Sequence, residues 1–363
     1  MLVAVLLLLA ACSSEPEATY EPQIVEVTRI VTVEAPARPR EISRLDIVRE
    51  RGNLVCASSR TAAGFGFLDN EGNTTGFDID LCRAVAAAVL GDANAVEFRL
   101  TSVAERGPAL QSGEVDVLSL NTTWTSSRDA QWGNFAQTMF YDGQGFMVRK
   151  DLGVSDMMEL AGARVCVQQG TTSELNLQDF NNQNKLNLEV ITFETSTPTS
   201  AAYEAKQCDA MTTDRSGLVS TRTGLADPSA HVILPGTISE EPLGPVVPHG
   251  DEQWYDIVKT VMAILIYAEA YGVTSTTVPD AVTGDSAVDR LFGLEGSYGQ
   301  DSLGLSDTVA QDIIRAVGNY GEIYDRNLTP LGLKREGSRN ALWAAAPCQE
   351  CPKGGQVYAA PLR

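Results

Sequence analysis

Residues 53–120 decide the fold, because short β-branched runs alternate there with a run of helical period. Residues 53–58 read NLVCAS and predict a strand, whereas residues 78–90 read DIDLCRAVAAAVL, with apolar side chains at helical spacing. Two further strands are predicted at 96–100, VEFRL, and at 115–120, VDVLSL. Strands separated by helices pair in parallel, so this region predicts an α/β unit with a mostly parallel sheet flanked by helices.

A second α/β series follows later in the chain. Strands are predicted at 164–167, 188–193 and 209–212. The proline-containing segment 236–247 predicts a crossing segment rather than a regular element. Residues 251–271 predict a long helix, whose apolar stretch is too short to span a bilayer and is expected to pack in a core.

The composition excludes several classes of function. The chain has 363 residues, with 47 Asp and Glu against 27 Lys and Arg, and its net charge of −20 argues against nucleic acid as a partner. A hydrophobic share of 44% is typical of a globular protein, and the length suits about two domains. The sequence contains no glycine-rich phosphate loop and no metal-ligand pattern, so we expect no nucleotide, metal or other cofactor.

The N-terminus has the pattern of an export signal. Residues 1–12 form an apolar run ending in Leu-Ala-Ala-Cys, which resembles a bacterial lipoprotein signal in which Cys12 is acylated and becomes the mature N-terminus. No Lys or Arg precedes this run, and an ordinary signal peptide with a coincidental cysteine is the alternative. Residues 13–40 contain several prolines and glutamates and predict a flexible tether. We therefore expect an extracytoplasmic protein with a lipid anchor at a membrane surface.

Seven cysteines leave six once an acylated Cys12 is set aside. An exported protein lies in an oxidising compartment, so three disulfides are expected, although six cysteines allow many pairings. Two of the favoured pairs would join neighbouring elements of one α/β unit, and the third would close a local loop. They are Cys56–Cys82, Cys166–Cys208 and Cys348–Cys351. A redox or metal-binding role for the third pair is the alternative.

Three polar clusters follow predicted strands, where ligands collect in α/β sheets. In the cluster at 121–128, the guanidinium of Arg128 offers two parallel donors to a carboxylate. The cluster at 170–174 lies where a strand passes into a helix, whose backbone N–H groups favour an anion. In the cluster at 212–217, Asp214 could accept hydrogen bonds from an ammonium group. Each cluster alone is equally consistent with an ordinary helix cap.

Further segments, distributed over most of the chain, carry a resemblance to a known family. They are GFDID at 76–80, QSGEVD at 111–116, the cluster at 121–128, YDGQGFMVRK at 141–150, VQQGTT at 167–172, PLGP at 242–245, VGNYGEI at 317–323 and NALW at 340–343. From about residue 43 to residue 363, the chain resembles the substrate-binding components of amino-acid ABC transporters, and among them the general L-amino-acid-binding branch.

This resemblance implies a type II periplasmic-binding-protein fold, in which two α/β lobes joined by a two-stranded hinge close on one L-amino acid. Lobe 1 would comprise 41–147 and 247–363, and lobe 2 would comprise 148–246. The chain would cross between the lobes near 147–150 and near 236–247. The protein would act as a monomer and deliver its ligand to the permease subunits of an ABC importer.

The resemblance also assigns roles to residues of the three clusters. The arginine that clamps the α-carboxylate corresponds to Arg128. The Gly-Thr-Thr that offers the same carboxylate its hydroxyl and N–H groups corresponds to Gly170, Thr171 and Thr172. The aspartate that takes the α-ammonium corresponds to Asp214. Opposite charges at the two ends of the site would compensate the cost of burying a zwitterion.

Other residues are expected at the edge of the same site. Asn121 and Thr123 match positions whose carbonyl or hydroxyl contacts the ligand. Phe65, Trp124 and Tyr141 are candidates for the side-chain pocket, and packing in the core is the alternative for each. How loosely this pocket is packed would decide which side chains are accepted.

The chain departs from the family pattern in two places. Arg106-Gly107-Pro108 puts a helix breaker where relatives carry a continuous helix, so we expect that helix to start at Pro108. Residues 344–355 are expected to form an insertion near the C-terminus. Neither departure lies at the predicted site.

Two other functions remain open from the sequence. Exported dehydratases that act on prephenate-like acids resemble these binding proteins, but such chemistry needs a positioned acid or base. His231 and His249 lie in predicted loops outside the three clusters, so we expect no enzyme. A sensor that presents a bound amino acid to a membrane receptor would use the same pocket.

Overall fold

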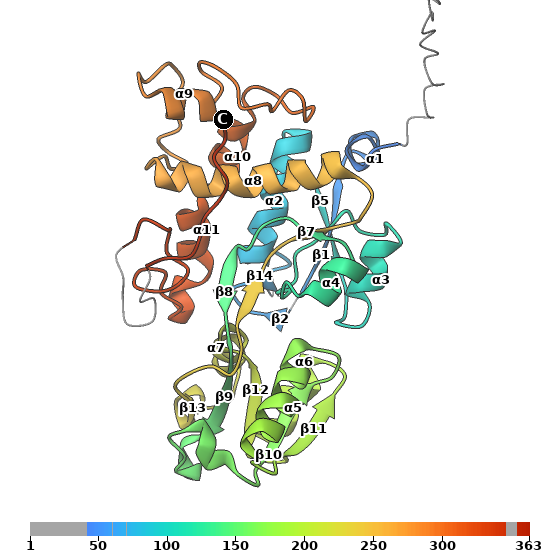
Figure 1. Cartoon of the computed structure of the whole chain (residues 1–363), viewed down its shortest axis with the longest axis vertical. Coiled ribbons are helices and arrows are strands. Elements are labelled where there is room, and N and C mark those ends of the chain that lie inside the picture. The colour runs from blue at the N-terminus through green and yellow to red at the C-terminus, as the bar shows by residue number, and fades with distance from the viewer. Residues whose placement is uncertain (1–41, 60, 70, 346–353) are drawn as a thin grey trace, which may run out of the picture. The chain divides into compact units, whose positions relative to one another are not determined.

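The computed structural model describes residues 42–345 and 354–363, except residues 60 and 70 (Figure 1). The compact unit that contains them is Ile42–Arg363. The predicted signal with Cys12, the tether at 13–40 and the pair Cys348–Cys351 lie outside the described residues.

The helices and the smallest sheet of the described chain have the following bounds. The α-helices are α1 (Arg44–Arg51), α2 (Phe77–Leu90), α3 (Arg106–Gln111), α4 (Ser126–Gln131), α5 (Thr172–Asn184), α6 (Ser196–Glu204), α7 (Arg215–Thr223), α8 (Glu252–Ala270), α9 (Ser286–Leu291), α10 (Val309–Val317) and α11 (Tyr320–Asn327). Short 3₁₀ helices lie at Lys150–Leu152, Met157–Leu160, Pro228–Ala230 and Thr329–Leu331. A small antiparallel sheet contains β2 (Thr61–Ala62), β3 (Gly66–Leu68) and β4 (Thr74–Thr75).

The first large sheet has the strand order β5-β1-β6-β15-β7. Its strands are β1 (Leu54–Ser58), β5 (Val96–Leu100), β6 (Val117–Leu118), β7 (Asn134–Phe135) and β15 (Val246–Val247). β1 pairs in parallel with β5 and β6, whereas β15 pairs antiparallel with both β6 and β7. All strands of this sheet except β15 therefore point the same way. The strand predicted at 115–120 is confirmed but is shortened to β6.

The second large sheet has the order β11-β10-β12-β9-β13 and repeats this topology. Its strands are β9 (Gln144–Arg149), β10 (Arg164–Gln168), β11 (Glu189–Phe193), β12 (Ala210–Asp214) and β13 (His231–Ile233). β10 pairs in parallel with β11 and β12, and β9 pairs antiparallel with β12 and β13. The predicted α/β architecture with two mostly parallel sheets is confirmed.

Two short strands connect the sheets. β8 (Phe140–Asp142) pairs antiparallel with β14 (Glu241–Leu243), so that Glu241 lies opposite Asp142. Figure 1 shows β8 and β14 side by side between the two groups of elements. β8 leads into β9 at Gln144, so the chain first passes between the sheets near residue 143. The crossing was expected near 147–150, but these residues end β9 of the second sheet or follow it directly. The predicted crossing at 236–247 contains two short strands, β14 and β15, rather than irregular chain only.

Alternate residues of the central strands supply two separate cores, because successive side chains of a strand point to opposite faces. In β1, Leu54 and Cys56 belong to the core that contains α2 and α8, whereas Val55 and Ala57 pack with Leu110 of α3. β10 divides its side chains between two cores in the same way. Helices therefore cover both faces of each sheet.

Each large sheet is joined to a neighbouring segment by a disulfide. Cys56 of β1 is bonded to Cys82 of α2, and Cys166 of β10 is bonded to Cys208, just before β12. These are two of the three expected pairs. All four cysteines are fully buried.

The longest described helix is α8, at nearly the bounds predicted for 251–271. Asp251 caps its first turn by accepting from the N–H of Trp254 at 2.8 Å. Among the residues that the structure describes, no helix combines the length and apolar character needed to cross a membrane. α8 instead buries most of its residues in the core with α2 and α10.

Two local predictions were wrong. α3 begins at Arg106 rather than at Pro108, because the first turn of a helix tolerates proline at a position whose N–H has no partner within the helix. His231 was expected in a loop, but it begins β13, pairs there with Arg149 and is buried. Its Nδ1 lies 2.7 Å from the hydroxyl of Tyr203. This contact gives the imidazole a hydrogen-bond partner, so that it can be buried in a strand.

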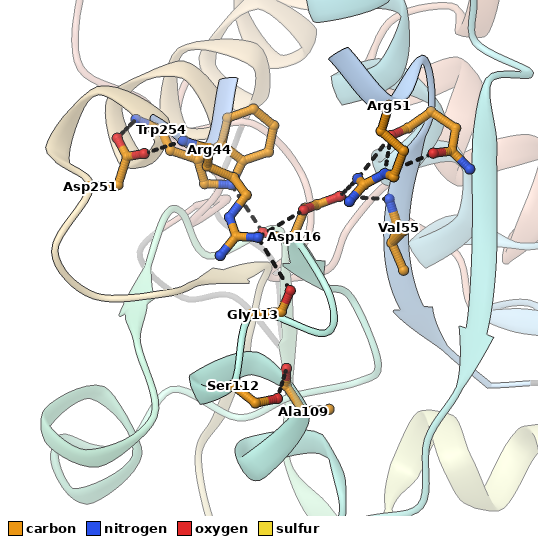
Figure 2. A network of polar contacts seen from close by, with 10 residues as sticks. Arg44, Arg51, Val55, Ala109, Ser112, Gly113, Asp116, Asp251 and Trp254 are labelled. Carbon is orange, nitrogen blue, oxygen red and sulfur yellow. Dashed lines mark hydrogen bonds and ion pairs between the residues drawn. The ribbon is translucent and has the colours of Figure 1, made fainter. Parts of the chain in front are cut away.

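Asp116 fastens the first sheet to two helices (Figure 2). Its carboxylate is fully buried, accepts from the N–H of Val55 at 2.7 Å and forms ion pairs with Arg44 and Arg51 of α1. Its carbonyl accepts from Nε1 of Trp254, the first large buried side chain of α8, at 2.9 Å. Removing one partner of a buried ion pair costs about 3–5 kcal/mol. Because the side chains of Arg44 and Arg51 are 18% and 32% exposed, only the lower end of this range is expected for Asp116.

Asp116→Ala is expected to lower the free energy of unfolding by about 3 kcal/mol, since Arg44, Arg51 and the N–H of Val55 lose their shared acceptor. Urea unfolding followed by circular dichroism measures this. The control is Glu114→Ala, which removes an ion pair with Arg99 in which both side chains are over 40% exposed; a loss below about 1 kcal/mol is expected. Equal losses in the two variants would contradict the role of Asp116.

Candidate functional site

A cavity of about 560 Å³ lies at the carboxyl ends of the parallel strands of both large sheets. It is lined by residues that end or follow β1, β5 and β6 of the first sheet and β10, β11 and β12 of the second. Parallel α/β sheets present their loops at this edge, so the cavity occupies the position where such folds bind ligands. Serine and threonine are the most frequent residues of its lining.

Arg128 reaches the cavity from the first turn of α4. The hydroxyl of Thr125 caps this helix by accepting from the N–H of Arg128 at 3.2 Å. The guanidinium is buried, and its Nη1 donates to the carbonyl of Thr123 at 3.1 Å. Burial lowers the pKa of Arg128, whereas the carboxylates of Glu241 and Asp214 oppose that shift. A buried guanidinium that faces a cavity is suited to binding a carboxylate.

Arg106 is a second buried cation of the cavity, which the sequence prediction missed. It lies in the first turn of α3, is 5% exposed and donates from Nη1 to the carbonyl of Leu120 at 3.4 Å. Burial and the neighbouring charge of Arg128 lower the pKa of Arg106 to about 9, against the opposing effect of Asp214. The two arginines give the cavity a positive wall.

The loop after β6 is held in place by a buried carboxylate. Asp78 of α2 accepts from the hydroxyl of Ser119 at 3.1 Å and from the N–H of Asn121 at 3.0 Å. Asn121 has a φ of 39°, a backbone angle that residues other than glycine rarely adopt. The hydrogen bond from its N–H to Asp78 stabilises this conformation. Burial raises the pKa of Asp78 to about 6, although both hydrogen bonds act to lower it. Asn121 and Thr123 line the cavity as a result.

Thr171 and Thr172 contribute hydroxyls from the start of α5. Thr171 caps this helix, accepting from the N–H of Glu174 at 3.1 Å, and donates to the carbonyl of Gln168 at 2.7 Å. The hydroxyl of Thr172 donates to Oε2 of Glu241 at 3.2 Å and lies 3.4 Å from the hydroxyl of Thr123. The contact between Thr123 and Thr172 joins the loops at the edges of the two sheets.

Three carboxylates gather beside the connecting strands. Asp214 ends β12 and lines the cavity, while Asp142 and Glu241 are buried opposite one another in β8 and β14. Burial and the charges of Asp142 and Glu241 raise the pKa of Asp214 well above its ordinary value, against the opposing effects of Arg128 and Arg106. A bound cation would favour the ionised form of Asp214.

The backbone and nearby side chains satisfy the other two carboxylates. Asp142 accepts from the N–H groups of Gly143 and Ser216 at 2.8 and 3.2 Å. Glu241 accepts from Nδ2 of Asn176 at 2.7 Å and from the hydroxyl of Ser239 at 2.6 Å. Asp214 is thus the member of the group that faces the cavity.

Residues 54–273 match the bacterial extracellular solute-binding proteins, family 3. The chain belongs to this family. Its fold is that of the type II periplasmic binding proteins, as the sequence resemblance implied.

Similar proteins cover nearly the whole chain. The general L-amino acid-binding periplasmic protein AapJ of Rhizobium johnstonii is 46% identical over 88% of this chain and 92% of its own length. The glutamate/glutamine/aspartate/asparagine-binding protein BztA of Rhodobacter capsulatus is 44% identical over 88% of this chain and 94% of its own. A periplasmic binding protein from Brucella ovis with glutathione bound matches with a TM-score of 0.82 and 42% identity, covering 88% of this chain and 99% of that one.

Four of the residues expected at the site of this solute-binding protein do not line the cavity. Phe65 packs edge-on against Phe140 in the core, at a ring distance of 5.3 Å. Trp124 is 41% exposed and stacks on Phe135, and Tyr141 packs against the core beside β14. Phe65 and Tyr141 thus contribute to the core, and Trp124 stacks on one neighbouring ring while the rest of its side chain is exposed.

Gly170 is the fourth of these residues, and its N–H is already used. It donates to Oε2 of Glu174 at 2.8 Å, and its φ of 73° suits a glycine at the turn before α5. Thr171 and Thr172, the two residues that follow, face the cavity instead.

Several lining residues of the cavity were missed from the sequence. The hydroxyl-rich run at 195–199 follows a predicted strand, as the three recognised clusters do, so the same rule could have identified it. Arg106 does not directly follow a predicted strand, so the same rule does not identify it; its segment indicated only the start of a helix. Glu241 and Asp142 approach Asp214 only through the pairing of β8 with β14.

The part of the chain that the structure describes contains no group of three or more His, Cys, Asp or Glu side chains arranged to hold a metal ion. The arrangement at the cavity is instead a pair of buried cations opposite a group of carboxylates. Such an arrangement binds a small molecule that carries both charges, one at each wall.

Proposed function

We propose that this protein is the extracytoplasmic solute-binding component of an ABC importer, which captures L-amino acids of broad range and delivers them to the membrane permease. The observation that carries the proposal is the position of Arg128 and Asp214, which bring opposite charges into one cavity from the two sheets. The names of the relatives support it: AapJ is a general L-amino acid-binding protein, and BztA binds four acidic and amide amino acids.

In this proposal, Arg128 binds the α-carboxylate, with Thr171 and Thr172 as further donors, and Asp214 binds the α-ammonium. Burying each charge of a zwitterion costs several kcal/mol unless it meets an opposite charge with good geometry. Because these contacts involve only the groups common to all α-amino acids, they select the amino-acid backbone. The hydroxyl-lined remainder of the cavity would accept different side chains.

The two sheets define two lobes that close on the ligand. Lobe 1 is built around the sheet of β1, and lobe 2 around the sheet of β10, with β8 and β14 as the hinge. A ligand held by both lobes favours the closed arrangement, so the permease can distinguish loaded from empty protein.

Arg128→Met is expected to weaken the binding of L-alanine, L-leucine and L-glutamate by about thirtyfold or more, since truncating one member of a buried charge pair costs about 2–5 kcal/mol. Calorimetric titration measures the affinities, and circular dichroism checks the fold. The matched control is Arg315→Met, an exposed arginine of α10 that pairs with Asp280; unchanged affinity is expected. Retained binding in Arg128→Met would refute the assignment of this residue.

Amino-acid binding is expected to release protons and to strengthen with rising pH. At pH values below its raised pKa, Asp214 is protonated before the ligand binds; an ammonium group favours its ionised form, so ligand binding in this pH range expels the proton. The affinity should therefore increase with pH until the raised pKa of Asp214 is passed.

The test is Asp214→Asn, titrated with L-alanine over about pH 4 to 8 in buffers that differ in ionisation enthalpy. We expect the variant to lose most of the proton release and to bind α-amino acids far more weakly, with a smaller loss for the corresponding deaminated acids. Asp301→Asn, at an exposed site, serves as the control. Equal losses for both kinds of ligand would contradict an ammonium-binding role.

We further propose that Cys12 carries the lipid that anchors the protein to the membrane surface. The sequence pattern that ends at Cys12 supports this. Mass spectrometry of the mature protein from its native host should find an acylated N-terminal cysteine, and Cys12→Ser should abolish the lipid. A mature N-terminus elsewhere would refute the anchor.

A further inference from the structure

We propose that Trp132 is a positioning residue for ligand binding, which holds the guanidinium of Arg128 in place through the face of its indole ring. This inference rests on the proposed carboxylate-binding role of Arg128. The inference also concerns Arg106-Gly107-Pro108, where the sequence departs from the family pattern. The structure brings this segment to the cavity through Arg106, and the proposed function gives no reason for the departure.

Both buried arginines of the cavity lie over the same indole ring. The guanidinium carbon of Arg128 is 5.0 Å from the ring centroid of Trp132, and that of Arg106 is 5.4 Å away. Cations within about 6 Å of an aromatic ring are attracted to its electron-rich face, and tryptophan is the strongest such acceptor. The attraction of both guanidinium groups to this ring partly offsets the repulsion between the charges of Arg106 and Arg128.

The glycine of the departing motif makes room for this ring. A Cβ atom at Gly107 would lie 2.8 Å from Cε2 and Nε1 of Trp132 and 3.0 Å from its Cδ2, which is closer than carbon atoms approach. Because the ring atoms belong to a rigid bicycle, they cannot give way as the end of a flexible chain would. A larger residue at position 107 is therefore incompatible with the observed position of the indole.

Trp132 acts through the arginines rather than on the ligand. It is not among the residues that line the cavity, whereas Arg106 and Arg128 both line it. The backbone of Trp132 is held at the end of α4, because its N–H donates to the carbonyl of Arg128 at 2.7 Å. The ring also packs against the core around Val55 and Leu110, which secures it from the other side.

A positioning role predicts a uniform effect on all amino acids, because Arg128 contacts the carboxylate that they share. Trp132→Leu is expected to weaken the binding of L-alanine, L-leucine and L-glutamate by about tenfold each, leaving their ratios unchanged. Trp132→Phe, which keeps an aromatic face, should recover affinities to within about threefold of the wild type.

A swap variant separates this role from simple packing. In the double variant Gly107→Leu, Trp132→Ala, the leucine side chain fills the space that the indole ring leaves. The thermal midpoint should therefore return towards the wild-type value, while the affinity should stay about tenfold weaker than that of the wild type. Thermal unfolding and calorimetric titration of the full chain measure both quantities. The matched control is Trp343→Leu, a half-exposed tryptophan near the C-terminus, for which unchanged affinity is expected.

Several results would overturn the inference. These are a swap variant that recovers affinity together with stability, a Trp132→Leu variant that binds within twofold of the wild type, and losses that differ strongly between ligands. If Trp132→Leu does not fold, equal affinities of Trp132→Phe and the swap variant would overturn it as well. A wild-type protein that binds none of these amino acids would instead refute the proposed function.

Discussion

The antiparallel pairing of β8 with β14 is the constraint on which the site depends. It places Asp142 opposite Glu241 and connects both sheets through two short strands. The same pairing holds the loop of Arg128, because the N–H of Trp124 donates to the carbonyl of Pro242 at 2.7 Å and Thr123 forms a bridge with Leu243. Cavity walls that come from distant parts of the chain are therefore set by a few backbone hydrogen bonds.

Charge balance explains why so many ionisable groups can be buried beside this pairing. Burial and the charges of Asp142 and Glu241 raise the pKa of Asp214, whereas Arg128 and Arg106 act to lower it. Asp214 in turn acts to raise the pKa values of both arginines, against the effect of their burial. Backbone N–H groups and neutral side chains satisfy Asp142 and Glu241, so Asp214 remains available at the cavity. The cavity thus has one cationic wall and one anionic wall.

The fold could be predicted from the sequence because its signals are local. The alternation in 53–58 and 78–90 reports which faces are buried, and the structure follows these bounds to within about one residue. Arg128 and Asp214 could be found because both follow strands and match a family pattern. Phe65 could not be assigned, since an apolar ring suits a pocket and a core equally well. Arg106 and Glu241 are brought to the site by tertiary packing, for which no local pattern exists.

The two buried disulfides have a consequence for how the molecule can move. Each joins a strand of one sheet to a segment that packs beside that sheet, and no disulfide of the described residues joins one sheet to the other. Oxidation therefore braces each half internally and adds no cross-link between the halves, so it would not oppose the lobe closure proposed above. A reducing environment would be expected to soften the halves themselves and to leave the range of that closure unchanged.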